Sequence, residues 1–172
     1  MLEKIIVEAR RHGFKPTNHL IHVSIAGQRM EVFQGGNRIA AYTVSTSKNP
    51  PSCLADSNGT PDGLHRIADK IGDDAPLGAV FKSRVPTGDF YWDLDRENLV
   101  TTRILWLEGL QPEHNRGGDR DSRDRYIYIH GTNHEDRLGQ PQSGGCINMS
   151  NTDVIELYNT VEPGALVWID RD

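Results

Sequence analysis

The strongest constraint on the fold is an alternation of apolar and polar residues that begins at His19. The stretch reads LIHVSIAGQRMEVFQGGNRIAAYTVSTS, and glycine-bearing turns interrupt it at Ala26-Gly27 and at Gly35-Gly36. Successive side chains of an extended strand point to opposite faces, so a period of two indicates strands with one buried face. With the intervening turns, the pattern predicts a β-meander.

Outside this meander the chain also favours strands over helices. Short apolar runs predict four more strands, at residues 64–68, 101–110, 126–130 and 165–169. Apolar residues at helical spacing predict one helix over 2–12 and another over 151–161, with Asn151 or Thr152 capping the second. We therefore expect a mostly-β domain, a sandwich or a partly open barrel, with one or two helices packed on it.

Two long segments between these elements predict loops. Residues 48–63 are rich in Pro, Gly, Ser and Asn. Residues 111–125 are strongly polar, and we expect them to form a solvated loop. Because this loop flanks the strand at 126–130, the alternative is that its arginines meet substrate carboxylates; they are Arg116, Arg120, Arg123 and Arg125.

The composition limits the classes of partner. A formal net charge of −5 leaves no basic excess to hold phosphates, which argues against nucleic acid as the main partner. No stretch approaches the roughly 20 apolar residues of a membrane-spanning helix. The first residues lack the layout of a signal peptide, so we expect a cytoplasmic protein, or a periplasmic one if a leader has been removed.

One of the two cysteines has an unusual setting. Cys146 follows Gly144 and Gly145, and a polar loop separates it from His130, which ends the predicted strand 126–130. Such a loop is long for a compact domain and returns the chain past that strand, so we expect thiol and imidazole side by side. The imidazole would take the thiol proton and leave a thiolate nucleophile. The glycines let the backbone approach a substrate, and the N–H groups of Gly145 and Cys146 are candidates for an oxyanion hole.

Other interpretations stay open at this point. A lone cysteine is most often a small buried hydrophobe, and a histidine that ends a strand is most often structural. His130, His134 and Cys146 are candidates for a zinc site. The chain has no CxxC, no HExxH and no evident fourth ligand, so we expect no metal there.

The sequence gives no indication of a role for the other cysteine. Cys53 lies in the proline-rich loop with no neighbouring histidine, and we interpret it as incidental. His65 and His114 are expected to be strand or surface residues. Two cysteines far apart form no disulfide framework, and a reducing compartment would leave both as thiols.

The text IHGT followed by SGGCINM resembles the signature of the L,D-transpeptidase catalytic domain family (YkuD-type). In that pattern a His-Gly-Thr at a strand end precedes a loop and then Ser/Thr-x-Gly-Cys, a hydrophobic residue and Arg or Asn. Many members carry His where this chain has Gly144. QRMEVFQGGNRIAAYTVSTS, GTPDGLHRI and NTDVIELYNTVEPGALVWI are similar to further parts of the family, so the resemblance spans about residues 19–170. The signature residues that match are His130, Gly131, Thr132, Ser143, Gly145, Cys146, Ile147 and Asn148.

The resemblance implies a β-sandwich-like catalytic domain over residues 19–172, preceded by a helical extension over 1–18. It implies that Cys146 is the nucleophile, that His130 is the base and later the acid, and that the backbone carbonyl of Gly131 orients the imidazole. It implies no metal and no organic cofactor. The N–H groups of Gly145 and Cys146 would form the oxyanion hole, Ser143 and Asn148 would hold the loop by hydrogen bonds, and Gly144 and Thr132 would support the site.

The implied substrate is a stem peptide of peptidoglycan, such as a tetrapeptide muropeptide. Cys146 would attack the carbonyl of the L-configured third residue, release the D-configured fourth residue and form a thioester. Because a cytoplasmic member meets soluble recycled muropeptides, we expect hydrolysis, that is, an L,D-carboxypeptidase that releases D-Ala. The alternatives are an L,D-transpeptidase that forms 3-3 cross-links or exchanges D-amino acids, and a non-catalytic module that binds stem peptides. A carbapenem adduct on Cys146 is a further expectation from the family.

Overall fold

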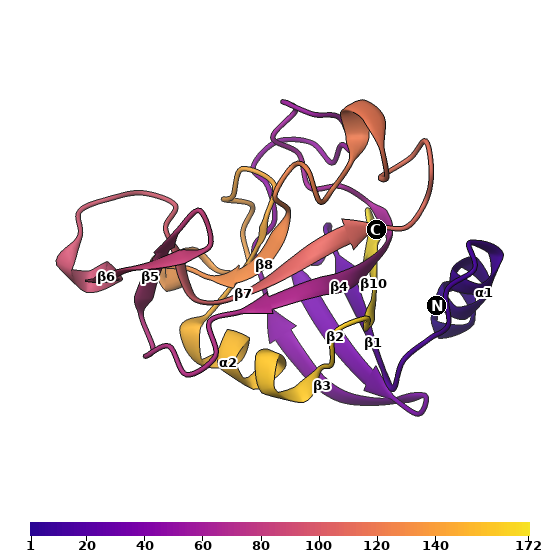
Figure 1. Cartoon of the computed structure of the whole chain (residues 1–172), viewed down its shortest axis with the longest axis horizontal. Helices are drawn as coiled ribbons and strands as arrows, with labels where there is room; N and C mark the ends of the chain where they lie inside the picture. The colour runs from indigo at the N-terminus through magenta and orange to yellow at the C-terminus, as the bar shows by residue number, and fades with distance from the viewer.

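The computed structural model describes residues 1–172, and its strands form one connected ten-stranded sheet. The main path runs β3-β2-β1-β10-β4-β7-β5-β6, while β8 branches from it by pairing with both β7 and β9. Figure 1 shows the strands from β3 through β2, β1, β10 and β4 to β7 side by side, with the β5–β6 hairpin projecting at one end of the molecule. An isolated antiparallel bridge between Ser45 and Asn148 joins the chain after β3 to β9, so the sheet curls back on itself. The predicted mostly-β fold with one or two packed helices is confirmed, with two helices present.

The predicted meander forms the first part of this sheet. It consists of β1 (His19–Ser24), β2 (Arg29–Gln34) and β3 (Asn37–Thr43), which pair as antiparallel neighbours. Gly35 and Gly36 both adopt positive φ angles, of 55° and 84°, as a tight hairpin turn between two strands requires.

Four other strands lie where the apolar runs predict them. They are β4 (Gly63–Ile71), β7 (Val100–Gly109), β8 (Tyr128–Gly131) and β10 (Leu166–Asp170), and β4 extends beyond the predicted end at residue 68. Three strands were not predicted, namely β5 (Ala79–Lys82), β6 (Val85–Phe90) and β9 (Ile147–Met149). Strand β6 is exposed along most of its length, and β9 has only three residues, so neither carries a period-two signal.

The helix α2 (Asn151–Thr160) covers one face of the sheet (Figure 1). Its Val154, Leu157 and Tyr158 are buried in the main core, together with side chains from β1, β2, β4 and β7 to β10. The predicted cap was wrong, because the hydroxyl of Ser150 accepts the hydrogen bond from the Asp153 N–H. The Asn151 side chain is instead buried between the helix and β7, where its Oδ1 accepts a hydrogen bond from Thr101.

The helix α1 (Leu2–Arg11) lies on the opposite side of the sheet from α2 (Figure 1). Ile5 and Ala9 are fully buried there, in a second apolar cluster with Leu64 of β4 and Leu166 of β10. The domain boundary proposed after residue 18 stays a prediction. Neither helix combines the length and the apolar character that crossing a membrane would require.

Candidate active site

Strands β8 and β9 place the sequence-predicted pair on adjoining strands. They run parallel, with Ile129 opposite Ile147 and His130 opposite Asn148, and Cys146 directly precedes β9. Ile129 and Ile147 point into the main core, so alternation turns His130 and Cys146 to the other face. The structure therefore brings the predicted thiol and imidazole to one face of neighbouring strands.

The thiol of Cys146 contacts backbone groups of the strand beside it. The N–H of Tyr128 donates to Sγ at 3.3 Å, and the thiol donates to the carbonyl of Tyr126 at 3.4 Å. The residue as a whole is partly accessible to solvent. No hydrogen bond joins its sulfur to His130, so the predicted contact between the two side chains is not made in this resting arrangement.

The imidazole of His130 is buried, and one contact settles its tautomer. Nδ1 lies 2.6 Å from the carbonyl oxygen of Gly131, which can only accept, so Nδ1 carries the proton. The lone pair of the neutral ring is therefore on Nε2, which has no hydrogen-bond partner within the protein. The predicted orienting contact from Gly131 is present. A Cβ at Gly131 would lie 2.7 Å from the carbonyl oxygen of Thr101, so this position has no room for a side chain.

Burial keeps both groups neutral in the resting site. It raises the pKa of Cys146 to about 11, although the Tyr128 N–H and the charge of Arg125 act in the opposite direction. It lowers the pKa of His130 to about 4, against the opposing effect of the Gly131 hydrogen bond. The expected resting thiolate is therefore not favoured, because both charged forms lose solvation and no hydrogen bond couples them.

The loop before the nucleophile leaves one backbone donor free. The N–H of Cys146 has no partner, whereas the N–H of Gly145 donates to Ser143 Oγ at 3.2 Å. Ser143 also donates to the carbonyl of Cys146 at 2.6 Å, so it holds the loop as predicted. Gly145 has a φ of +131°, a conformation that side chains rarely adopt. Of the two predicted oxyanion donors, only Cys146 is available without rearrangement.

Two predicted supporting residues act through their backbones. Asn148 exchanges two backbone hydrogen bonds with Ser45, of 2.8 and 2.9 Å, while its buried side-chain Oδ1 has no partner. Asn148 therefore makes hydrogen bonds that hold its segment, through its backbone and to the chain after β3. Thr132 donates its N–H to Met149 and accepts the Asn151 amide on its carbonyl, which ties β8 to β9 and to α2.

A cavity of about 310 Å³ lies beside the Cys146 loop. Gly144 forms part of its wall, and no atom lies within 4 Å of where a Cβ on this glycine would be. The backbone at Gly144 therefore has room for the histidine that the family pattern often has at this position. The cavity is lined by Ala55, Asp56, Asn58, Asp124, Arg125, Tyr126, Ile127 and Gly144.

The loop over residues 111–125 is less solvated than predicted. Asn115 and Ser122 are completely buried, because both tie the loop to the sheet by hydrogen bonds. Arg123 pairs with Asp69 at 2.6 Å and does not line the cavity beside Cys146. Arg125 does line this cavity, and it also donates to backbone carbonyls of the 48–63 loop, including that of Gly59 at 2.7 Å.

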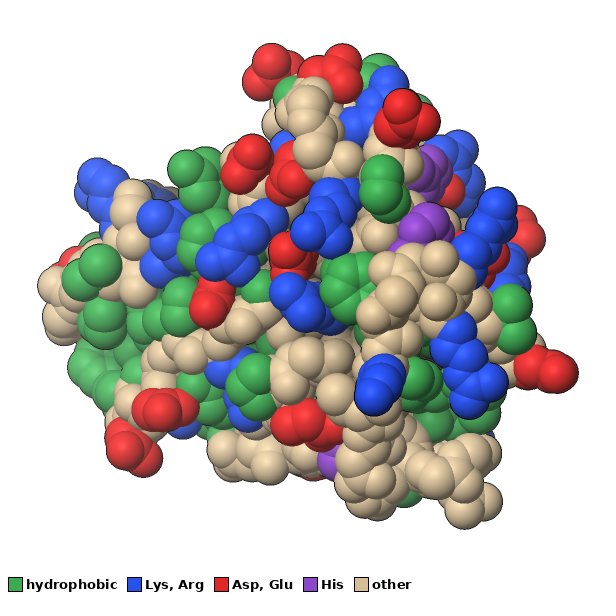
Figure 2. Space-filling model, turned by 45° about the vertical axis from the view of Figure 1, so that its right-hand side comes forward, with side chains coloured by type: hydrophobic (Ala, Val, Ile, Leu, Met, Phe, Trp, Pro, Cys, Tyr) green, Lys and Arg blue, Asp and Glu red, His purple; other side chains and the backbone are tan.

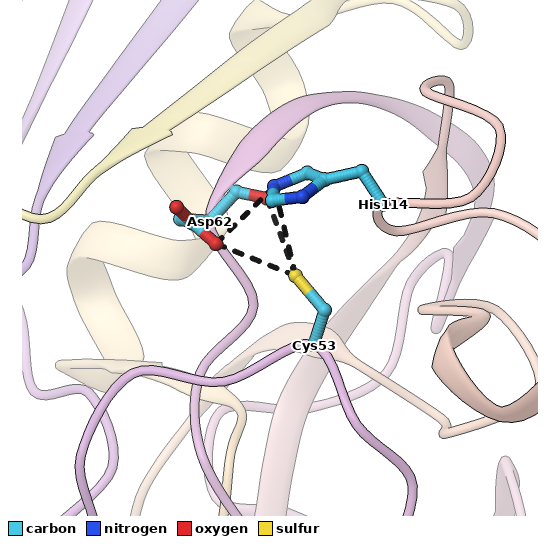
Figure 3. A group of neighbouring side chains, drawn as sticks. All are labelled: Cys53, Asp62 and His114. Atoms are coloured by element: carbon cyan, nitrogen blue, oxygen red, sulfur yellow. Dashed lines mark hydrogen bonds and ion pairs between the residues drawn. The ribbon is translucent and has the colours of Figure 1, made fainter.

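Cys53 has two ionisable neighbours in the fold that its position in the sequence did not indicate. Its sulfur lies 3.3 Å from Asp62 Oδ1 and 3.8 Å from His114 Nε2, as Figure 3 shows. His114 comes from a loop distant in sequence, so the sequence around Cys53 does not predict this contact. These three residues form the only group of candidate metal ligands whose donor atoms lie within 4.8 Å of one another. The zinc alternative that combined His130, His134 and Cys146 is therefore not supported by their placement.

Comparisons with known proteins bear on the family and on the fold. A model of the YkuD L,D-transpeptidase catalytic domain matches residues 18–169. Two Bacillus subtilis (strain 168) proteins, each named provisionally as an L,D-transpeptidase, are similar to parts of the chain. YqjB is 37% identical over 93 residues, which are 51% of this chain and 52% of YqjB. YkuD is 51% identical over 90 residues, which are 52% of this chain and 47% of YkuD.

The chain thus spans about half the length of the curated relatives it matches. Among solved structures, L,D-transpeptidase 3 from Mycobacterium tuberculosis, in complex with a faropenem-derived adduct, has a TM-score of 0.58. The similarity covers 92% of this chain and 63% of that one at 16% identity. At this identity the similarity shows the fold.

Proposed function

Because the chain belongs to the L,D-transpeptidase catalytic domain family, we propose that it cleaves peptidoglycan stem peptides by acyl transfer through Cys146. The observation that carries the proposal is the shared face of β8 and β9. On it lie Cys146, a residue partly accessible to solvent, and a buried imidazole whose free Nε2 is a base. The Cys146 N–H next to them has no partner. These are the three parts that nucleophilic attack on a carbonyl needs.

The neutral resting pair determines how the first step proceeds. The thiol proton is directed at the Tyr126 carbonyl, so a rotation of the Cys146 side chain toward His130 precedes attack. Nε2 of His130 then accepts the proton while sulfur bonds to the carbonyl carbon of the third stem residue. The Gly131 carbonyl accepts a hydrogen bond from the Nδ1–H group, and this contact favours the imidazolium that forms.

The second half of the reaction uses the same two residues. The oxyanion accepts a hydrogen bond from the Cys146 N–H, and the tetrahedral intermediate collapses by breaking the bond to the fourth residue. The leaving amine takes the proton from Nε2, which leaves a thioester on Cys146 and a neutral His130. Neutral His130 can then deprotonate the acceptor, as the mechanism requires.

The acceptor distinguishes the two enzyme activities. The names of the two Bacillus subtilis relatives support an amine acceptor, and therefore a transpeptidase that forms a 3-3 cross-link or exchanges the terminal D-amino acid. The net charge of −5 instead favours water and a small soluble muropeptide, because it opposes association with an anionic wall polymer. On the face in Figure 2, basic and acidic side chains are interspersed, which offers such a polymer no broad basic surface.

The deciding experiment is incubation with a disaccharide-tetrapeptide, with and without a D-amino acid, followed by mass spectrometry. A product of unchanged length that carries the added amino acid indicates transpeptidation, whereas loss of D-Ala in water indicates the carboxypeptidase. Cys146→Ala serves as the inactive control and Cys53→Ala as the matched thiol control. Intact substrate under all conditions, with no acyl-enzyme in the mass spectrum of the protein, would refute the proposal.

A β-lactam offers a second test of the nucleophile. The faropenem-derived adduct belongs to the Mycobacterium tuberculosis relative, and we propose that a penem or carbapenem acylates this chain at Cys146. The predicted result is one added mass per chain, which peptide mapping places on residue 146. An adduct on Cys53, or none on either thiol, would contradict the assignment.

A further inference from the structure

Three side chains from two loops converge outside the β8–β9 site. Cys53 belongs to the loop before β4, Asp62 directly precedes β4, and His114 lies in the loop after β7. The sulfur lies 3.3 Å from Asp62 Oδ1 and 3.8 Å from His114 Nε2, while Nε2 and Oδ1 are 3.3 Å apart (Figure 3). We propose that Cys53, Asp62 and His114 form a binding site for a divalent transition-metal ion, with Zn²⁺ as the best match.

The three distances fit one face of a tetrahedron around zinc. Zn–O, Zn–N and Zn–S bonds of about 2.0 to 2.3 Å at tetrahedral angles place neighbouring donor atoms about 3.3 to 3.6 Å apart. The observed separations of 3.3, 3.3 and 3.8 Å differ from these by a few tenths of an ångström, which small side-chain rotations can correct. A thiolate, an imidazole and a carboxylate are also the ligand types that zinc uses in proteins.

The same geometry argues against a second nucleophilic cysteine. In a Cys-His-Asp relay, one ring nitrogen contacts the thiol and the other contacts the carboxylate. Here a single nitrogen, Nε2 of His114, faces both Cys53 and Asp62, so the ring cannot relay a proton between them. Donor atoms that converge on one point suit a shared cation.

The surrounding fold holds the cluster in place. Gly63 has a φ of +96°, and a Cβ there would lie 2.2 Å from Gln111 Oε1 and 3.1 Å from His114 Cδ2. The glycine therefore allows the His114 loop to lie directly against the start of β4. Asn115 fastens the loop by donating to the backbone carbonyls of Asp62 and Leu64, each at 3.1 Å.

Accessibility leaves room for a fourth ligand. Cys53 is buried, whereas the side chains of Asp62 and His114 are 20% and 44% exposed. Water can therefore reach the open side of the three donors and complete a four-coordinate site. Arg171 binds Asp62 mainly through Oδ2, at 2.9 Å, and this contact orients the carboxylate so that Oδ1 faces Cys53 and His114.

Binding at this site has a defined proton balance. Without the ion, Sγ of Cys53 lies 3.3 Å from Asp62 Oδ1, which can only accept, so the thiol carries its proton and donates it to this contact. Zn²⁺ would displace this proton and bind the thiolate, which releases one proton per ion bound. Affinity is therefore expected to increase with pH below the pKa of the thiol.

The proposed ion would brace the cavity beside Cys146. Its ligands connect the 48–63 loop to the 111–125 loop, and the same two loops supply Ala55, Asn58 and Arg125 to that cavity. Where the stem peptide occupies this cavity, a metal at Cys53 would hold two walls of the binding site together without contacting the reacting atoms. This role depends on the proposed function, whereas metal binding itself does not.

Metal binding is measured with the full chain carrying Cys146→Ala, which removes the other thiol. Titration with Co²⁺ is expected to produce a thiolate-to-metal charge-transfer band in the near ultraviolet that saturates at one equivalent, and added Zn²⁺ should displace it. Equilibrium dialysis should give one bound Zn²⁺ per chain. These two measurements need no enzymatic turnover. A failure to bind metal can therefore be distinguished from a failure of the proposed function.

Further variants in the same background test the ligand set. Cys53→Ser should abolish the band, and His114→Gln should weaken Co²⁺ binding at least tenfold. The matched control, His12→Gln, removes a histidine at the end of α1 and should leave the titration unchanged. Circular dichroism shows whether each variant is folded. Absence of the band in the folded parent, or its persistence in Cys53→Ser, would overturn the proposal.

Discussion

The two cysteines have the same raised pKa and opposite surroundings. Burial raises the pKa of both thiols to about 11. Around Cys146 the contacts are neutral backbone groups, including an N–H that favours the thiolate, and His130 lies on the same face with a free Nε2. Around Cys53 the contacts include two ionisable side chains besides the Asp62 backbone carbonyl, and the Asp62 carboxylate disfavours the thiolate further. Thiol pKa alone therefore does not identify a nucleophile; the neighbouring donors and acceptors do.

The largest expected effect distinguishes the Cys146 region, meaning Cys146 and its surroundings, from the Cys53 region around the other thiol. Cys146→Ala should reduce both turnover of tetrapeptide and penem acylation by at least about a thousandfold, since no other group supplies the covalent step. In protein without added metal, Cys53→Ala should retain acylation at the parental rate within about threefold, because its sulfur contacts Asp62 and His114 and not the Cys146 site. The measurement is the rate of adduct formation by mass spectrometry, with urea unfolding as the folding control. Equal losses in the two variants would remove the distinction between the regions.

The next effect is on stability in acid, where each region contributes one buried histidine. His130 lies in the Cys146 region and His65, between Gly63 and Ser122, in the Cys53 region, and burial lowers the pKa of both to about 4. Between pH 6.5 and 4 the unfolded chain takes up protons on these rings and the folded chain does not. Stability should therefore fall as the pH decreases, by up to about 1.4 kcal/mol per pH unit for each ring.

Urea unfolding between pH 7 and 4.5 measures this slope. His65→Gln and His130→Gln should each remove about half of it, whereas His12→Gln, at the end of α1, should change it little. The His19 contact helps to lower the pKa of Glu162 to about 2 from the usual 4.5, so Glu162 loses its contribution to stability only in more acidic solution. The measured pH range lies above that. A slope that survives in the His65→Gln, His130→Gln double variant would show that other groups cause the acid sensitivity.

A smaller effect on stability tests the backbone turn at Gly63, against which the His114 loop packs. Gly63→Ala should destabilise the protein by about 1–3 kcal/mol, because the backbone has a positive φ and the new Cβ would meet Gln111 Oε1 at 2.2 Å. Urea unfolding measures the loss of stability. A Co²⁺ titration of the same variant should also show weaker binding, since the Gln111–Asn115 segment must move away from β4. Unchanged stability would indicate that this turn adapts freely and does not position His114.

The sequence predicted the Cys146 region far better than the Cys53 region. IHGT and SGGCIN carry the first site within two short segments, and the strand ending at His130 follows from the alternation in YIYIH. What it could not predict there was the protonation state, since this depends on burial by residues distant in sequence. The three-residue strand β9 was also missed, because it is too short to show a period.

The Cys53 cluster depends on contacts between residues far apart in the chain. Asp62 and His114 are separated by β4 to β7, and only the pairing of β4 with β7 brings the two loops together. No spacing rule for metal ligands anticipates such an arrangement. Likewise, Arg123 and Arg125 look equivalent in the sequence, and only the structure shows that Arg125 alone lines the cavity beside Cys146.

The smallest expected effect concerns Gly144, the position at which many relatives carry histidine. Unlike Gly63, it has no atom within 4 Å of the point that a Cβ would occupy, and its φ lies outside the left-handed range. Gly144→Ala should therefore change stability by less than about 0.5 kcal/mol. Gly145→Ala is the matched control, since its φ of +131° should make it clearly destabilising. If urea unfolding shows the two variants to be equally stable, backbone conformation does not explain the second glycine. If Gly144→His keeps parental stability but changes KM more than kcat, the side chain at this position acts on the substrate through the cavity that Gly144 lines.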